Sequence, residues 1–347
     1  MATDLDVALL GYGLAGSVFH APLIAATPGL RLHTVASRDP HKVAQRHPHA
    51  RVVADPAQAF ADPAVDLVVI ATPNDTHAPL AIAALAAGKH VVVDKPFALG
   101  SAEAEAMIAA ADAAGRVLGV FHNRRWDADF LALRDLLQAG ALGEVVELHS
   151  HFDRFRPQVP DRWRDREGPG NGLWYDLGPH LVDQVLQLFG PPLAVSADLV
   201  RQRDGARAVD YFHVQLRYRR LRAISSTGAL VPGHGLRFAV HGSGGSWLKQ
   251  GLDPQEEALR GGAVPGGADW GRDPRPGVLL QVQSDGRVCE VPSPAPPGDY
   301  RAYYAHLRDA INTGGEPPAS AHDALVVTRV IEAGLLSNEQ RREVAFA

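Results

Sequence analysis

Cysteine is nearly absent from this sequence: Cys289 is the single one among 347 residues. A disulfide within the chain is therefore impossible, which argues against a small disulfide-stapled secreted fold and favours a reducing compartment. Long hydrophobic runs are also missing, since no stretch approaches the ~18 apolar residues of a membrane-spanning helix. The first residues contain no basic segment of the kind that opens a secretory signal. We therefore expect a cytoplasmic protein without a membrane partner.

A strong excess of one charge is missing as well. The 34 basic and 39 acidic residues leave a formal net charge of −5, and the pI is near 6.3. Binding to nucleic acid or to an anionic membrane usually requires a marked basic excess, so we expect neither partner. The composition, with 46% hydrophobic and 21% charged residues, is that of a globular protein. The length suggests about two domains.

Short apolar strands and alanine-rich helices alternate over the first third of the chain. The pattern predicts strands at 7–10, 32–36, 66–70, 91–93 and 117–120. Helical stretches such as 79–87 and 102–114 lie between strands. Strand–helix–strand units of this length are typical of a doubly wound parallel sheet, so we predict a Rossmann-type α/β domain over residues 1–121.

The pattern changes after Phe121. Longer strands are predicted at 144–152, 195–201, 211–218, 222–227, 237–241 and 278–282, and helices near 173–189 and 321–338. Glycine-rich and proline-rich turns separate the strands, and 261–277 is expected to be an exposed loop. The sequence therefore predicts a second domain, residues 122–347, of α+β type with a largely antiparallel sheet.

A glycine motif follows the first predicted strand directly and precedes a predicted helix. Glycines at this spacing permit a tight turn and a close approach of the backbone to a pyrophosphate, and the helix N-terminus attracts the anion. The alternative is a plain tight turn. We expect a dinucleotide to contact Gly11, Gly13, Leu14, Ala15 and Gly16. Because proline disrupts a helix interior, we also expect the helix to be kinked or broken near Phe19–Pro22.

The residues after the second predicted strand bear on which dinucleotide binds. An enzyme that uses NAD usually has an acid about 20 residues beyond the glycines, where it holds the ribose 2′-hydroxyl. This sequence has Ser37 and Arg38 there, which can hydrogen-bond to and pair with a 2′-phosphate. In the alternative, Arg38 is an ordinary surface arginine and Asp39 holds the ribose. We favour NADP(H) over NAD(H).

Another predicted strand ends in Thr72-Pro73-Asn74, with His77 close behind. Ligands of open parallel sheets bind outside the carboxyl ends of the strands. Asn74 and His77 are therefore expected to face the cofactor ribose and nicotinamide, with Thr72 and Pro73 beside them. Alternatively, Asn74 or Asp75 caps the following helix, and the two roles are compatible.

The next predicted strand ends in Asp94-Lys95-Pro96, which places an ammonium group at a turn. Lysine is common at solvated strand ends, and that is the plain explanation. This strand end, however, belongs to the same ligand edge as the glycine motif. Proline restricts the backbone of the residue before it, which helps to aim Lys95. We predict that Asp94 and Lys95 border the cofactor and that Lys95 polarises a hydroxyl or carbonyl and shares its proton.

One predicted helix of the second domain carries polar residues at helical spacing. Asp176, His180, Asp183 and Gln187 follow the order i, i+4, i+7 and i+11, so they share one stripe. A carboxylate one turn from an imidazole can fix the ring for proton transfer. The alternative is a helix N-terminus at which Asp176 satisfies free amides and His180 fills space.

A metal ion would also suit an Asp–His pair. A third ligand at helical spacing is missing from the sequence, however, and His149 and His151 are expected to alternate across a strand. We therefore expect no metal site.

These motifs together resemble the glucose–fructose oxidoreductase/inositol dehydrogenase (Gfo/Idh/MocA) family. The resemblance rests on LLGYGLAGSVFH, ATPNDTHAPLAIAALAAGKHVVVDKP and GLWYDLGPHLVDQ, which occur in the family's order over much of the chain. The family usually has Glu-Lys-Pro where this chain has Asp94-Lys95-Pro96, a change that keeps the charge and the lysine. Within the family, GKHVVVDKPFAL, FHNRRWDADF, SHFDRFRPQVPDRWR and DYFH look most like the NADP-dependent scyllo-inositol dehydrogenase branch.

The resemblance implies a Rossmann domain followed by a domain with a large, open, mostly antiparallel sheet, whose outer face commonly forms homodimers or homotetramers. It implies an oxidoreductase that transfers a hydride between NADP(H) and a secondary alcohol or ketone of a cyclic polyol or sugar. The implied catalytic group is Lys95, Asp176 and His180. Positions that often border cofactor or substrate in the family correspond to Asn123, Trp163 and Arg164.

Polar and aromatic residues also gather in the stretch 151–166, namely Asp153, Arg154, Arg156, Trp163 and Arg164. Such groups suit paired contacts to the hydroxyls of a polyol, whereas the alternative is a solvated charged loop. The predicted substrate contacts are Lys95, Asn123, Asp153, Arg156, Asp176 and His180.

Two other functions stay open from the sequence. One is reduction of a different carbonyl, such as a keto sugar, a dihydrodiol-type substrate or a tetrapyrrole-like ligand. The other is an NADP(H) sensor without turnover. The presence of Lys95, Asp176 and His180 argues against a sensor, because a sensor needs only the loops of the first domain.

Overall fold

The computed structural model of the protein describes residues 4–233 and 235–346, and the chain divides into two compact units. Unit 1 holds the residues up to Asn123 together with Gln255–Trp270 and Asp299–Thr328. Unit 2 holds Arg124–Pro254, Gly271–Gly298 and the residues from Arg329 onward. The chain thus leaves unit 1 after Asn123 and returns to it twice, which a single division after residue 121 does not anticipate.

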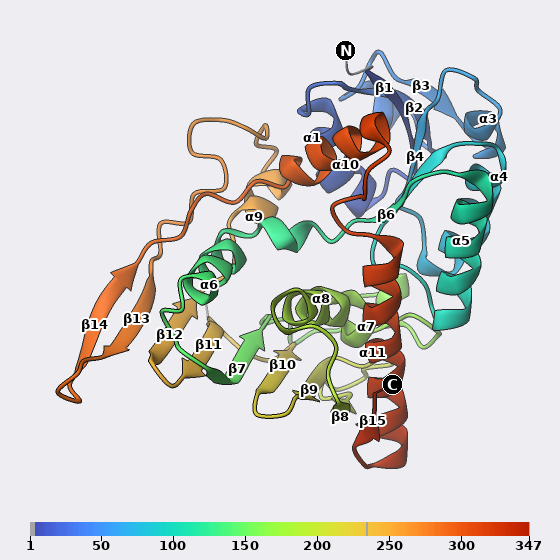
Figure 1. Ribbon diagram of the computed structural model, residues 1–347. Helices are drawn as coiled ribbons and strands as arrows, with labels where there is room; N and C mark the ends of the chain where they lie inside the picture. Colours follow the sequence, from blue (N-terminus) through green and yellow to red (C-terminus); the bar gives the residue numbers. More distant parts are fainter. Residues whose placement is uncertain (1–3, 234, 347) are drawn as a thin grey trace. The chain divides into compact units, whose positions relative to one another are not determined.

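Unit 1 is built on a parallel sheet with the order β3-β2-β1-β4-β5-β6 within the described residues (Figure 1). Its strands are β1 (Leu5–Leu10), β2 (Leu30–Ala36), β3 (Arg51–Val53), β4 (Leu67–Ile70), β5 (His90–Val93) and β6 (Leu118–Val120). This order confirms the predicted doubly wound sheet, and it reverses between β1 and β4, where such sheets bind ligands. The sequence pattern missed β3, because three residues are too few to show a period.

Helices cover both faces of this sheet, so nearly every residue of β1, β4 and β5 is buried. The helical segments are η1 (Ala15–His20), α1 (Ala21–Ala25), α2 (Pro40–Ala44), α3 (Ala57–Phe60), η2 (Asn74–Thr76), α4 (His77–Ala86), α5 (Ser101–Ala114), α9 (Gln255–Arg260) and α10 (Arg301–Thr313). The core joins the strands to α4, α5 and the first turn of α11 (Ala321–Gln340), through residues such as Leu85, Met107 and Leu325.

Unit 2 contains a second sheet, with the order β14-β13-β12-β11-β7-β10-β9-β8-β15 over the residues that the structure describes. Its strands are β7 (Val145–His151), β8 (Ala194–Val200), β9 (Tyr211–Arg217), β10 (Arg222–Gly228), β11 (Leu236–Gly242), β12 (Gly245–Gln250), β13 (Gly277–Val282), β14 (Val288–Ser293) and β15 (Val344–Ala345). The expected mostly antiparallel sheet is confirmed, with one parallel pair, β7 and β10, that the sequence pattern did not predict.

The two faces of the unit 2 sheet differ in burial. Leu148, Val214 and Val240 point to one face and are fully buried, whereas Glu147 and His213 are exposed on the other. The helical segments of this unit are η3 (Asn123–Trp126), α6 (Ala128–Gln138), η4 (Trp163–Asp165), α7 (Leu173–Asp176) and α8 (Gly178–Phe189). Of these, α8 packs on β10.

The single helix predicted over 173–189 is wrong in one respect, because the structure has two helices there. α7 ends at Asp176, and α8 begins at Gly178 with Pro179 in its first turn. Proline has no N–H to continue the ladder of the preceding turn but suits the first turn of a new helix. Gly178 lies so close to Trp174 that a Cβ would stand 2.6 Å from its ring. Asp176 therefore ends one helix, while His180 and Asp183 belong to the next.

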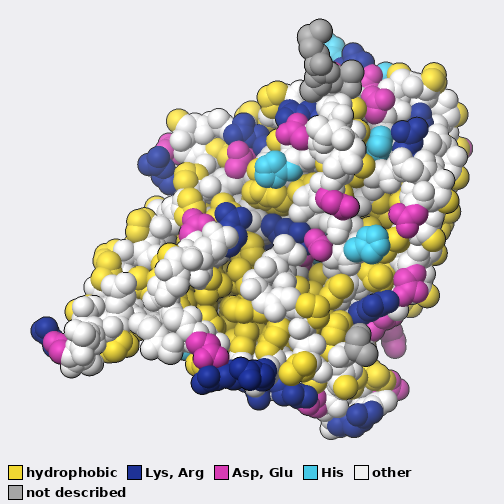
Figure 2. Space-filling model, viewed as in Figure 1, with side chains coloured by type: hydrophobic (Ala, Val, Ile, Leu, Met, Phe, Trp, Pro, Cys, Tyr) yellow, Lys and Arg dark blue, Asp and Glu magenta, His cyan; other side chains and the backbone are white. Residues whose placement is uncertain are grey.

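Basic and acidic side chains are interspersed on the face that Figure 2 shows, as the small net charge predicts. Among the described residues, none of the helices is long and apolar enough to cross a membrane.

Candidate active site

The glycine turn after β1 packs tightly against neighbouring backbone atoms on one side and borders open space on the other. Gly11 has φ +91°, and a Cβ there would stand 2.5 Å from the Ala71 carbonyl oxygen. A Cβ on Gly16 would stand 2.0 Å from the Gly11 oxygen, so both positions require glycine. Gly13 is exposed, and a Cβ on it would meet nothing within 4 Å. The turn therefore leaves open space at the edge where a pyrophosphate can approach the backbone.

The helix after this turn is not broken at Pro22. Its first part, η1, is a π-helix, and it passes directly into α1 with Pro22 in the first turn of that helix. The wider π-turn places Pro22 at a helix start, where its missing N–H is tolerated. At the N-terminal end, Ser17 donates from both its amide and its hydroxyl to the Gly13 oxygen, at 2.9 and 2.7 Å. Leu14 is 45% exposed beside the turn.

At the end of β2, Asp39 and Arg38 have different surroundings. The Asp39 carboxylate accepts the Lys42 N–H at 3.0 Å and so caps α2. Its own amide donates to Ser37 Oγ at 3.1 Å. Arg38 is exposed, and no carboxylate within residues 4–233 and 235–346 forms an ion pair with it. Asp39 is thus engaged in the helix cap, while the Arg38 guanidinium is accessible at the ligand edge of the sheet.

Lys42 is a further basic residue at this edge that the sequence argument missed. Its Nζ donates to the Tyr12 carbonyl oxygen at 3.3 Å and lies 5.7 Å from the centre of the Tyr12 ring. Burial raises the pKa of the Tyr12 hydroxyl, and the charge of Arg46 opposes that shift. Tyr12 lies within the glycine motif, so Lys42 joins α2 to the turn. A lysine four residues after Arg38 on the following helix is the signal that could have revealed it.

His77 is buried between two strand-end loops rather than at an open surface. Its Nδ1 lies 2.9 Å from the Pro96 oxygen, and its Nε2 lies 3.1 Å from the Thr72 oxygen. Burial lowers the pKa of His77, while the charge of Asp94 and the backbone oxygens oppose that shift. The ring therefore ties the end of β4 to the end of β5. Its predicted contact with the cofactor stays a prediction.

Thr72, Pro73 and Asn74 follow β4 at the same edge. Thr72 and Thr76 share a hydrogen bond of 2.6 Å between their hydroxyls, and the Asn74 side chain is buried. The N-cap positions of η2 and α4 are Pro73 and Thr76, so neither Asn74 nor Asp75 occupies a cap position of these helices. Asn123, which begins η3, is also buried.

Asp94 and Lys95 follow β5, and the peptide bond between Lys95 and Pro96 is cis. The Asp94 carboxylate is buried and accepts the Lys95 N–H at 2.8 Å. Burial by itself raises the pKa of Asp94, but the His20 ring and the charges of Lys95 and His77 outweigh burial and lower that pKa to about 2. The carboxylate is therefore ionised at neutral pH, and the half-buried Lys95 side chain starts beside a fixed negative charge.

In unit 2, the predicted polar stripe divides into residues with separate surroundings. Asp176, at the end of α7, lies 3.9 Å from the Arg164 guanidinium, and His180 is buried in the first turn of α8. Asp183 is buried against Arg125, with Nη2 2.6 Å from Oδ1. Gln187 is exposed. The stripe is therefore not one continuous polar surface, and Asp183 is engaged in an ion pair.

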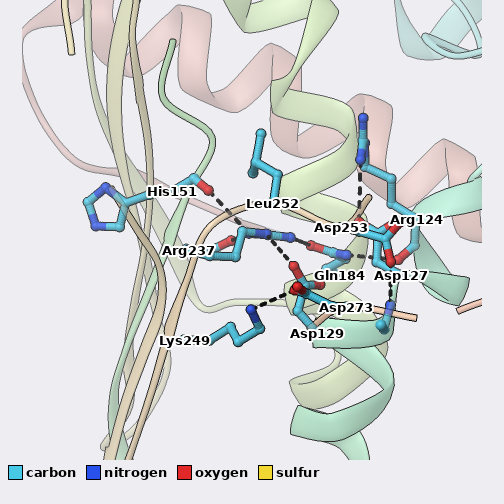
Figure 3. Close-up of polar contacts among 12 residues, drawn as sticks. Arg124, Asp127, Asp129, His151, Gln184, Arg237, Lys249, Leu252, Asp253 and Asp273 are labelled. Atoms are coloured by element: carbon cyan, nitrogen blue, oxygen red, sulfur yellow. Dashed lines mark hydrogen bonds and ion pairs between the residues drawn. The ribbon is translucent and has the colours of Figure 1, made fainter. Parts of the chain in front are cut away.

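A buried polar network supports α8 (Figure 3). Gln184, one turn after His180, donates to the Arg124 oxygen at 2.9 Å and accepts from Arg237 Nη2 at 2.6 Å. Arg237 also pairs with Asp129 at 3.3 Å, and both side chains are almost fully buried. These contacts join α8 to α6, β11 and the segment after Asn123. The rotation of α8, and with it the direction of His180, is held from two sides.

The polar cluster predicted over 151–166 is also divided. Arg164 stacks over the Trp163 ring at 4.9 Å and lies beside Asp176, so these three residues come together in unit 2. Asp153 instead accepts the Gly228 N–H at 2.9 Å, and Arg156 is exposed. The structure thus groups Trp163 and Arg164 with Asp176, and it uses Asp153 to hold the end of β10.

The expectation that His149 and His151 alternate across a strand is wrong. Residues i and i+2 of a strand share a face, and the two rings stack with centroids 6.0 Å apart. Within the described residues, no group of three or more His, Cys, Asp or Glu side chains is placed to hold a metal ion.

Known proteins match this chain over nearly its whole length. Residues 5–122 match "Oxidoreductase family, NAD-binding Rossmann fold", and residues 134–346 match "Oxidoreductase family, C-terminal alpha/beta domain". YdgJ of Escherichia coli, an uncharacterized oxidoreductase, is 52% identical over 347 residues and covers 100% of both chains. IolW of Bacillus subtilis, a scyllo-inositol 2-dehydrogenase (NADP(+)), is 39% identical and covers 98% of this chain and 95% of its own. The solved structure of yvaA from Bacillus subtilis is 38% identical, with a TM-score of 0.97 and coverage of 100% and 99%.

Proposed function

This chain belongs to the glucose–fructose oxidoreductase/inositol dehydrogenase (Gfo/Idh/MocA) family of oxidoreductases, and from that premise we propose that it is an NADP(H)-dependent dehydrogenase of a cyclic polyol or sugar. The oxidoreductase class and the nicotinamide cofactor come with the family. The preference for NADP(H), the substrate class and the roles of individual residues are the proposal. The reaction would interconvert a secondary alcohol and its ketone.

The substrate class is carried by one observation, the similarity to IolW. That relative is named a scyllo-inositol 2-dehydrogenase (NADP(+)), and it aligns with this chain over 342 residues. A cyclic polyol presents several secondary hydroxyls, which suit the polar group of Trp163, Arg164 and Asp176 in unit 2. An inositol is therefore the first substrate to test.

Support for NADP(H) comes from the end of β2. The Asp39 carboxylate, which an NAD enzyme would use on the ribose, caps α2 instead. Arg38 is exposed, and Ser37 Oγ and the Lys42 ammonium lie on the same stretch of chain. Two cations and a hydroxyl suit a 2′-phosphate, whereas an acid would repel it. The open space at Gly13 fits the pyrophosphate of the same dinucleotide.

When bound, the nicotinamide ring accepts the hydride in oxidation and donates it in reduction. We assign the remaining chemistry to three side chains. His180 accepts the proton of the substrate hydroxyl, and the Lys95 ammonium stabilises the oxygen as its negative charge grows. Asp176 supports the imidazolium that results. Positioned acid–base groups of this kind contribute on the order of 10²–10⁴-fold to a rate.

The remaining proposed contacts follow the family resemblance. For the cofactor they are Gly11, Gly13, Leu14, Ala15, Gly16, Ser37, Arg38, Thr72, Pro73, Asn74, His77, Asp94, Asn123, Trp163 and Arg164. For the substrate they are Asn123, Asp153 and Arg156 beside the catalytic group. We further propose a cytoplasmic homodimer or homotetramer that assembles through the open face of the unit 2 sheet.

The decisive assay incubates the pure protein with NADP⁺ or NAD⁺ and a panel of inositols and aldoses, while the absorbance of the reduced cofactor is followed. Reduction of NADP⁺ by an inositol, lost in Lys95→Met, is the expected result. The reverse assay uses NADPH with keto-inositols and keto sugars. Tight NADPH binding without turnover in either direction would overturn the dehydrogenase proposal and favour a nucleotide sensor.

A further inference from the structure

The glycine-motif helix carries a buried imidazole for which the proposed reaction has no use. His20 ends η1, and its side chain is fully buried. Its Nδ1 lies 2.6 Å from the Tyr304 hydroxyl of α10, and its Nε2 lies 3.8 Å from Asp94 Oδ1. The ring also packs on Phe121 at 4.3 Å. Tyr304, His20 and Asp94, from three distant parts of the sequence, thus form one row of polar contacts inside unit 1.

The direction of the hydrogen bond between Tyr304 and His20 depends on which ring nitrogen carries the proton. Burial raises the pKa of Tyr304 well above its usual value, and the nearby Tyr303 and Asp94 raise it further. The phenol therefore keeps its proton, which it can donate to His20 Nδ1. A ring that accepts at Nδ1 carries its own proton on Nε2. That N–H faces Asp94 at a distance longer than a hydrogen bond, so the contact is electrostatic.

Asp94 connects the Tyr304–His20 pair to Lys95. Its Oδ1, the atom nearest His20 Nε2, also accepts the Lys95 N–H at 2.8 Å. The carboxylate therefore fixes the backbone from which the Lys95 side chain extends. Four titratable groups face it from the elements packed around it: His20 from η1, His77 from α4, Tyr304 from α10 and the adjacent Lys95.

We propose that Tyr304, His20 and Asp94 are positioning residues, a buried chain that holds the Lys95 backbone and keeps a negative charge beside its ammonium group. Tyr304 selects the ring tautomer, His20 presents an N–H to the carboxylate, and Asp94 holds Lys95. The inference rests on the proposed function in one respect, that Lys95 acts on the substrate.

The tautomer is tested directly in the free protein, without turnover. Two-bond ¹H–¹⁵N correlation spectra of histidine-labelled protein report which ring nitrogen carries the proton, and His20→Gln identifies the His20 signal. We expect the Nε2–H form in the wild type and its loss in Tyr304→Phe. The matched control is Tyr303→Phe, which removes the same atom from the neighbouring buried residue and leaves the Tyr304–His20 hydrogen bond in place. A spectrum unchanged by Tyr304→Phe would overturn the inference.

Kinetics then test the consequence for Lys95. Tyr304→Phe should lower kcat by about tenfold or more through misplacement of Lys95, with KM and NADPH affinity unchanged. In Asp94→Asn the carboxylate that accepts the Lys95 N–H becomes a neutral amide, so kcat should fall in this variant as well. The double variant Tyr304→Phe with Asp94→Asn should lose no more activity than the worse single variant, because both changes interrupt the same row of contacts to Lys95. Additive losses, or wild-type kcat in both single variants, would refute the positioning role of Tyr304, His20 and Asp94.

These outcomes separate the inference from the proposed function. If Lys95→Met retains activity, the proposed role of Lys95 fails, while the tautomer measurement still tests the Tyr304–His20 contact. If Lys95→Met is inactive and Tyr304→Phe behaves as wild type in both measurements, the positioning chain alone fails.

Discussion

The Arg125 guanidinium forms a bidentate ion pair with the Asp183 carboxylate, with Nη2 2.6 Å from Oδ1 and Nε 3.0 Å from Oδ2. Both side chains are buried, and Asp183 lies one turn after His180 on α8. Arg125 belongs to η3, which begins at Asn123. The ion pair therefore holds α8, which carries the proposed catalytic residue His180, against Arg125, which lies two residues after the proposed site residue Asn123.

Removal of Arg125 should be costly because it takes a buried counter-charge away from the Asp183 carboxylate. We expect Arg125→Met to lower the free energy of unfolding by about 3–5 kcal/mol. Replacement of both partners, as in Arg125→Met with Asp183→Leu, should recover most of the loss, because the buried carboxylate is removed together with its counter-charge. Urea unfolding followed by circular dichroism measures both values. Equal stability of Arg125→Met and the wild type would show that the pair contributes nothing.

Loss of the Arg38 guanidinium should affect one cofactor and spare the other. Hydrogen bonds to a charged group contribute about 1.5–3 kcal/mol, so Arg38→Ala should weaken NADPH binding by roughly 10–100-fold. Binding of NADH should not change, since NADH has no 2′-phosphate. Arg31→Ala is the matched control, because Arg31 is an exposed arginine paired with Asp6. Fluorescence titration of the wild type and both variants with NADPH and NADH measures the six affinities. An equal loss of NADH binding in Arg38→Ala would show that Arg38 does not act on the 2′-phosphate.

Substitution of the proposed catalytic residues should separate chemistry from cofactor binding. We expect Lys95→Met and His180→Ala each to lower kcat by about 10²–10⁴-fold while NADPH affinity is kept. His213→Ala, which removes an exposed imidazole from the open face of the unit 2 sheet, should have wild-type kcat. Steady-state rates and NADPH titrations on the same preparations give both quantities. A His180→Ala variant with wild-type kcat would remove His180 from the mechanism.

The low pKa of Asp94 predicts how stability changes in acid. The pKa falls from the usual 3.8 to about 2 in the folded protein. Because the folded pKa lies below the unfolded one, the ionised carboxylate stabilises the fold above about pH 4, by about 2 kcal/mol. That contribution is lost as the pH falls from about 4 to 2. The stability difference between wild type and Asp94→Asn should therefore shrink over this range, as urea unfolding at a series of pH values can measure. A constant difference would contradict the assignment.

Much of unit 1 was predictable because its signals are local. Buried parallel strands appear as continuous apolar runs, so β1, β2, β4, β5 and β6 could all be identified from the sequence. The glycine motif predicts a turn that requires glycine at Gly11 and Gly16. Ser37 and Arg38 follow the motif at a fixed spacing. β3 was missed because it is three residues long, and β12 because its first residues were taken for a turn.

Contacts between distant segments were not predictable from the sequence. Helical spacing placed Asp176, His180 and Asp183 on one stripe, but Pro179 starts a new helix and Arg125 pairs with Asp183. The position of the His77 ring between the Pro96 and Thr72 backbone oxygens also has no signal in the sequence. Spacing describes one helix at a time, and it says nothing of the side chains that another segment brings against it.

The sequence by itself determined the class of this protein: a parallel dinucleotide-binding sheet, a second, mostly antiparallel sheet and membership of an oxidoreductase family. Each of these follows from short-range periodicity or from residues a few positions apart. Only the tertiary structure decided that His20 meets Tyr304, 284 residues away, and that Asp94 lies between His20 and Lys95. Such contacts depend on the close packing of a folded interior, where a buried polar group must find its partner wherever the chain supplies one.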